Sequence, residues 1–137
     1  MEILTPLYAL FAPILVWPVE LLFPYPYIVE ELIKAVIVFF SERDSTASSS
    51  SKIKLYILAG VFFALSETVL YILNFSAVGR LDYLLIRFVL TSFLHTTTFL
   101  VMYASTYKNL KWLPLGFILA VLIHYIFNLV LTNYSFL

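Results

Sequence analysis

Four apolar stretches, each long enough to cross a membrane, constrain this chain more than any other feature. They run from Ile3 to Phe23, Ile53 to Phe75, Leu81 to Met102 and Trp112 to Leu131. A bilayer core of about 30 Å needs about 20 apolar residues in a helix, so each stretch predicts a membrane span. Hydrophobic residues make up 63% of the 137-residue chain, which excludes an ordinary soluble globular protein. We expect an all-α, polytopic transmembrane bundle.

A fifth apolar segment, Tyr27 to Phe40, is shorter and carries charged residues. At ~1.5 Å per residue it covers only about 21 Å, so it must borrow residues before Pro26 or lie beside a cavity. Five of the six prolines lie within the first 26 residues. They predict a kinked first span and a tight turn into the second. We count about five spans, and the sequence leaves open whether the first two segments form one span or two.

The chain forms one predicted transmembrane domain, residues 1–137, interrupted by a polar, serine-rich stretch at residues 41–52. We expect that stretch to be a flexible extramembrane loop. With five spans, one side of the membrane receives five basic residues and the other receives Arg80. The first set is Arg43, Lys52, Lys54, Lys108 and Lys111. The positive-inside rule then predicts a cytoplasmic N-terminus and an outside C-terminus.

Charge and cysteine content exclude several classes of function. The formal net charge is zero and no basic run occurs, so we expect no nucleic-acid partner. The chain has no cysteine, which excludes disulfides, thiolate metal sites and a cysteine nucleophile. We expect the chain to lie in the lipid bilayer, which is its main partner.

Ionisable residues of four predicted spans fall at one depth. Counted from the predicted cytoplasmic ends, they lie roughly 12–21 Å into the bilayer. The set is Glu30, Glu31, Glu67, His95 and His124. Unpaired charges there are costly, so we expect Lys34, which shares a face with Glu30 at i,i+4, and Arg87 to hold the carboxylates in structural ion pairs. A single Glu–Lys pair is most often only structural, but the whole set at one level favours a functional pocket.

Two kinds of hydrolytic chemistry suit these side chains. A glutamate can activate water, while His124 and Asn128, one turn apart, hydrogen-bond a developing oxyanion. The alternative is zinc held by His95, His124 and a carboxylate such as Glu67, with another glutamate as base. Two histidines and no thiolate are few zinc ligands, so we favour the metal-free mechanism and keep zinc as possible. A different class also remains, a non-catalytic protein using the pocket for ion or proton transfer or as a scaffold for a partner.

Four motifs follow one another on successive predicted spans: Glu30-Glu31-x-x-Lys34, Glu67-x-x-x-Tyr71, Arg87 with His95, and His124-x-x-x-Asn128. In this order they resemble the motifs of the PrsW-type intramembrane proteases, within the wider superfamily of CAAX prenyl endopeptidases and bacteriocin-processing proteins. The resemblance implies an intramembrane endopeptidase acting on a membrane-protein or peptide substrate. By that analogy Glu30 or Glu31 activates water, His95 assists, and His124 with Asn128 forms the oxyanion hole.

Overall fold

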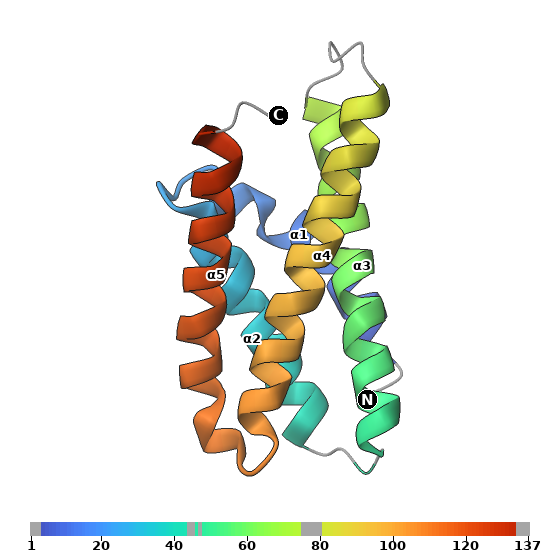
Figure 1. Ribbon diagram of the computed structural model, residues 1–137, viewed down its shortest axis with the longest axis vertical. Helices are drawn as coiled ribbons and strands as arrows, with labels where there is room; N and C mark the ends of the chain where they lie inside the picture. Colours follow the sequence, from blue (N-terminus) through green and yellow to red (C-terminus); the bar gives the residue numbers. More distant parts are fainter. Residues whose placement is uncertain (1–3, 44–45, 47, 75–80, 134–137) are drawn as a thin grey trace.

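The computed structural model is a bundle of five α-helices, and it describes residues 4–43, 46, 48–74 and 81–133 (Figure 1). No strand occurs among these residues, so the predicted all-α bundle is confirmed. The helices are α1 (Thr5–Glu20), α2 (Pro26–Arg43), α3 (Ser49–Asn74), α4 (Leu81–Thr106) and α5 (Leu113–Asn133), with a 3-10 turn, η2 (Leu110–Trp112), before α5.

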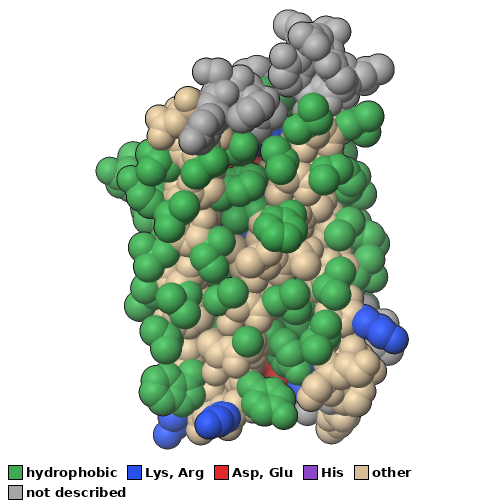
Figure 2. Space-filling view, viewed as in Figure 1, with side chains coloured by type: hydrophobic (Ala, Val, Ile, Leu, Met, Phe, Trp, Pro, Cys, Tyr) green, Lys and Arg blue, Asp and Glu red, His purple; other side chains and the backbone are tan. Residues whose placement is uncertain are grey.

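Three helical segments have the length and apolar composition to cross a membrane: Ser49–Leu73, Leu84–Thr106 and Leu110–Asn133. Helix α1 is a shorter apolar helix, and α2 carries the charged residues noted above. Hydrophobic side chains cover most of the visible outer face (Figure 2). Since large apolar side chains on all five helices are exposed, the molecule presents a hydrocarbon-compatible surface and is an integral membrane protein.

Successive helices run in opposite directions, as a five-span chain requires (Figure 1). The start of α1, the junction of α2 with α3 and the α4–α5 connection lie toward one end, and the last turn of α5 lies toward the other (Figure 1). The predicted loop at residues 41–52 is partly helical, because α2 continues to Arg43 and α3 begins at Ser49. Positions 44, 45 and 47 of that loop lie outside the described residues.

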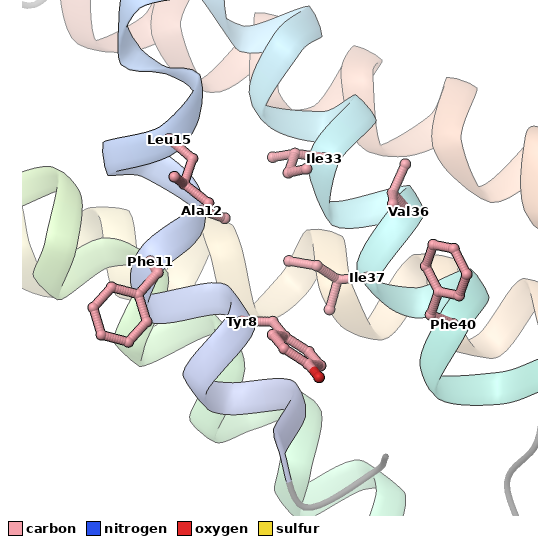
Figure 3. Close-up of a pocket in the computed structure, with 8 residues that line it drawn as sticks. All are labelled: Tyr8, Phe11, Ala12, Leu15, Ile33, Val36, Ile37 and Phe40. Atoms are coloured by element: carbon pink, nitrogen blue, oxygen red, sulfur yellow. The ribbon is translucent and has the colours of Figure 1, made fainter.

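The first two apolar segments form two helices, joined by residues 21–25. Pro13 and Pro18 lie inside α1, where each removes one backbone hydrogen bond. An apolar cavity of about 300 Å³ opens between α1 and α2. Aromatic side chains from both helices, including Phe11 and Phe40, line it (Figure 3). The two helices therefore pack less closely there than α3 and α4 do.

Small residues bring the long helices together. A Cβ atom on Gly60 of α3 would overlap backbone atoms of Thr96 in α4. A Cβ atom on Gly116 of α5 would overlap the side chain of Ser105, also in α4. Close backbone approach at small residues is the usual way in which membrane helices pack. Helix α4 is thus held tightly between α3 and α5, and this fixes which of its faces points inward.

The interior of the bundle contains an apolar core and two groups of polar side chains. Its apolar part is built around Tyr56, Phe63, Phe99 and Met102, all fully buried or nearly so. Toward the α2–α3 connection, the Glu42 carboxylate accepts hydrogen bonds from Lys52 Nζ at 2.8 Å and Tyr56 Oη at 2.8 Å. Deeper in the bundle, α2, α4 and α5 contribute the buried polar residues described next.

Candidate active site

Glu31 and Lys34 of α2 form a fully buried ion pair. Their side chains are 0% exposed, and Lys34 Nζ lies 2.6 Å from Glu31 Oε1. Spacing made Glu30 the expected neighbour at i,i+4, but the lysine bonds to Glu31 at i,i+3. The ammonium also lies 4.5 Å from the centroid of the Phe63 ring. Burying both charges is tolerable because each is paired and hydrogen-bonded.

His95 of α4 joins this pair to a second one. Its Nδ1 lies 2.7 Å from Lys34 Nζ, and its Nε2 lies 2.6 Å from Glu67 Oε2 on α3. The other oxygen of Glu67 accepts a hydrogen bond from Arg87 at 2.9 Å. The Arg87 guanidinium stacks 4.3 Å from the centroid of Tyr71. The helix face that carries Glu67 and Tyr71, at i,i+4, therefore meets the face that carries Arg87 and His95, at i,i+8, across the α3–α4 contact.

His124 of α5 completes the cluster. Its Nδ1 lies 2.7 Å from Glu31 Oε1, and its Nε2 lies 3.9 Å from Glu30 Oε2. The rings of His124 and His95 are 5.6 Å apart between centroids. Glu30 Oε2 is buried and has no hydrogen-bond partner among the described residues. The Glu31 carboxylate thus bonds to Nδ1 of His124, while the Glu30 carboxylate faces Nε2 of the same ring.

A polar cavity of about 350 Å³ reaches this cluster between α1, α2, α3 and α4. Glu30, Glu67 and Arg87 line it, together with apolar and aromatic side chains. Asn128 lines a neighbouring cavity of about 310 Å³, which Arg87 also borders. Arg87 therefore stands between the carboxylate cluster and the asparagine, and the structure does not bring Asn128 into direct contact with Glu30.

Three of these residues are spaced as metal ligands could be. One ligand atom from each of Glu30, His95 and His124 lies within 4.8 Å of the other two. This group differs from the set expected from sequence in having Glu30 in place of Glu67. Glu67 instead bridges His95 and Arg87.

The sequence interpretation missed two contributors. Glu20, which is not among the residues expected in the site, lines the polar cavity with Glu30, and its Oε1 is buried without a partner among the described residues. Thr98, also not expected there, accepts a hydrogen bond from Lys34 Nζ at 3.2 Å. For Thr98 a signal existed, since it follows His95 by three positions on one helical face. For Glu20 no spacing signal existed, because its position depends on how α1 crosses the bundle.

Comparison with known proteins identifies the family of this chain. No curated protein and no solved structure matches the chain significantly. The sequence model described as PrsW family intramembrane metalloprotease matches residues 20–137, which include every ionisable residue of the cluster. Because that match spans most of the sequence, the chain belongs to the PrsW family of intramembrane proteases.

Proposed function

We propose that this protein is an endopeptidase that hydrolyses a peptide bond of a membrane-associated substrate with water activated by Glu30. One observation carries the proposal: Glu30 Oε2 and His124 Nε2 face each other at 3.9 Å beside a polar cavity inside the bundle. That separation is too long for a direct hydrogen bond, and the exposed part of the Glu30 side chain lines the cavity, where it can contact a water molecule. The pocket thus offers a place for the attacking water next to a carboxylate.

The proposed reaction needs one proton acceptor that later becomes a donor. Glu30 takes a proton from the water as its oxygen attacks the carbonyl carbon, and the carbonyl oxygen becomes an oxyanion. When the intermediate collapses, the C–N bond breaks and Glu30 gives the proton to the departing nitrogen. One water is consumed, and a carboxylic acid and an amine are formed. The Glu30 side chain is 13% exposed, which suits a base that must reach both water and substrate.

His124 and Asn128 are assigned to the oxyanion, as the resemblance implies. In its resting tautomer His124 donates Nδ1–H to the Glu31 carboxylate, and that carboxylate stabilises the ring when Nε2 shares the proton that Glu30 has taken from the water, so that Nε2–H can then donate to the oxyanion. Asn128 follows one turn later on α5 and offers an amide N–H₂ donor. Since Asn128 lines the cavity beside Arg87, the substrate carbonyl would lie where these two cavities adjoin. Glu67 and His95 support this arrangement from α3 and α4.

The family description names a metalloprotease, and the donor types here fit a metal. Two imidazoles and a carboxylate are common zinc ligands, and Glu30 offers a buried oxygen without a partner among the described residues. Glu30, His95 and His124 would hold the ion, which would supply Lewis-acid polarisation and a more acidic water. However, both ring nitrogens of His95 already lie at hydrogen-bond distance from Lys34 and Glu67. Metal binding at His95 would break one of those bonds, so we favour the metal-free mechanism.

We also propose the orientation with the N-terminus in the cytoplasm. The basic side chains visible in Figure 2 lie toward the end that carries the α2–α3 and α4–α5 connections (Figures 1 and 2). Cytoplasmic loops carry an excess of such residues. Accessibility of a cysteine introduced at Ser48 or Lys108, probed with a membrane-impermeant thiol reagent in intact cells, checks it. Labelling from outside the cell would reverse the assignment.

Peptidase activity is tested by comparing new protein N-termini in membranes of cells producing the wild type or Glu30→Gln. Removing a general base lowers the rate about 10²- to 10⁴-fold, so the N-termini generated by the wild type should disappear. Glu42→Gln is the matched control, because Glu42 pairs with Lys52 away from the cavity. An identical set of N-termini from the wild type and Glu30→Gln would refute the proposal and leave the non-catalytic alternative.

Metal content of the purified, active protein decides between the two mechanisms. The metal-free mechanism predicts substoichiometric zinc and full activity after treatment with a chelator. Stoichiometric zinc, with activity lost to the chelator and restored by zinc, would reassign Glu30, His95 and His124 as ligands.

A further inference from the structure

We propose that Lys34 is a positioning residue that, together with Glu67 and Glu31, fixes the orientation and hydrogen positions of both histidines. In this arrangement both ring nitrogens of His95 are hydrogen-bonded, to Lys34 and to Glu67. Of the four imidazole nitrogens, only Nε2 of His124 faces Glu30. The effect of Lys34 on catalysis rests on the proposed function, whereas its effect on the two rings does not.

The ammonium of Lys34 has a partner for each of its hydrogens. A charged lysine carries three N–H donors and no acceptor. Around Nζ lie Glu31 Oε1 at 2.6 Å, His95 Nδ1 at 2.7 Å and Thr98 Oγ1 at 3.2 Å. The lysine side chain is fully buried and lies over the Phe63 ring. Lys34 therefore uses its three donors within the bundle, and these contacts hold the ammonium in position.

This arrangement determines the tautomer of His95. Because the ammonium can only donate, Nδ1 must accept, and the ring hydrogen lies on Nε2. There it donates to Glu67 Oε2 at 2.6 Å. The ring is 0% exposed. His95 thus has no nitrogen free to contact a water or a substrate, and it transmits the position of Lys34 to Glu67.

The same ammonium orients His124 indirectly. Oε1 of Glu31 accepts from Lys34 Nζ at 2.6 Å and from His124 Nδ1 at 2.7 Å. Since a carboxylate can only accept, the hydrogen of His124 lies on Nδ1. Nε2 is then free to face Glu30, from which it lies 3.9 Å away. By holding Glu31 in place, Lys34 determines which nitrogen of His124 takes part in proton exchange.

Histidine tautomers can be measured directly in the full-length protein. The chain has only two histidines, so a ¹⁵N-histidine sample purified through a tag without histidine gives two ring systems. Two-bond ¹H–¹⁵N correlation spectra in nanodiscs should show His95 protonated at Nε2 and His124 protonated at Nδ1. Variants His95→Gln and His124→Gln assign the signals. A wild-type spectrum with His95 protonated at Nδ1 would overturn the proposal.

A variant tests whether Lys34 is the cause. Lys34→Met combined with Glu31→Gln removes both charges, so neither is left buried without its partner. The glutamine oxygen can still accept from His124, whereas His95 loses its donor. Glu67 still accepts from Nε2–H, so the hydrogen of His95 stays on Nε2, while Nδ1 loses its hydrogen bond. We expect the ¹⁵N signal of His95 Nδ1 to move toward that of a nitrogen without a hydrogen bond, and about a tenfold or greater loss of kcat with KM changed less than twofold. Lys52→Met is the control, because it breaks the Lys52–Glu42 pair, which lies away from the cavity. It should change neither the His95 signals nor kcat.

The outcomes separate the two proposals. An unchanged ¹⁵N signal of His95 Nδ1 in the double variant would refute the role of Lys34, even if peptide cleavage is established. The expected spectra in a protein that cleaves no peptide would leave the role of Lys34 intact and refute the proposed function. Should the double variant fail to fold, the wild-type spectrum still decides whether His95 and His124 carry the stated hydrogens.

Discussion

Gly60 gives the sharpest test of the helix packing that positions the site. Its replacement by alanine places a Cβ atom against the Cα and N atoms of Thr96. These are backbone atoms of α4, so no side-chain rotation relieves the overlap, and α3 and α4 must separate. Overpacking a close contact costs about 1–3 kcal/mol. We expect Gly60→Ala to lower the free energy of unfolding by that amount.

Gly116→Ala is the matched comparison in the same bundle. Its Cβ would meet Ser105 Cβ at 2.9 Å and Met102 Cα at 3.0 Å, and would also overlap Ser105 Oγ. Most of that overlap involves a side chain. Adding Ser105→Gly should therefore restore most of the stability lost in Gly116→Ala. By contrast, adding Thr96→Ala should not rescue Gly60→Ala, because the atoms that collide belong to every residue type.

Unfolding in mixed micelles with increasing SDS, followed by tryptophan fluorescence, measures these differences. Four variants and the wild type under one lipid-to-detergent ratio give the comparison. A Gly60→Ala protein within about 0.5 kcal/mol of wild type, the range of an ordinary surface substitution, would show that α3 and α4 do not approach as described. Rescue of Gly60→Ala by Thr96→Ala would contradict the backbone origin of the overlap.

Three further predictions use the same unfolding measurement. Arg87→Met leaves Glu67 without its guanidinium partner and should cost about 1–2 kcal/mol, much of it regained when Glu67→Gln is added; no recovery would contradict the pairing. Glu31→Gln leaves a buried ammonium without its carboxylate and should cost about 3–5 kcal/mol; a stable variant would argue against that ion pair. Tyr56→Phe removes the hydrogen bond to Glu42 and should cost about 1 kcal/mol, a loss that should vanish in a Glu42→Gln background.

The fold and much of the site followed from local rules. Apolar run length predicted the helices, and helical spacing placed Arg87 and His95 on one face and Glu67 on another, which the structure joins. The spacing of residues in the sequence did not predict which side chains bond to Lys34 and His124. Glu31 and His124 are 93 positions apart, and their contact depends on how far α2 and α5 rotate about their axes. Rotation is set by packing at small residues, which no single-helix pattern records.

Glu20 shows a second limit of prediction from the sequence. Its neighbours in sequence are apolar and a proline precedes it by two positions, which is typical of a helix end at the membrane surface. In the structure it lines the same cavity as Glu30 because α1 packs against both α2 and α3, which places the last turn of α1 beside the first turns of α2. The tilt of a short, proline-containing helix depends on the whole bundle, so the sequence near Glu20 could not reveal it.

The unequal helix lengths have a consequence for the surrounding lipid. At about 1.5 Å per residue, the 16 residues of α1 span about 24 Å, whereas the 26 residues of α3 span about 39 Å. Hydrocarbon beside α1 must become thinner to match it, while α3 must tilt or project into the headgroups. Since Glu20 at the end of α1 lines the polar cavity, the thinned region adjoins the site. Headgroups and water then approach Glu30 from that side, which shortens the apolar path that a water molecule must cross.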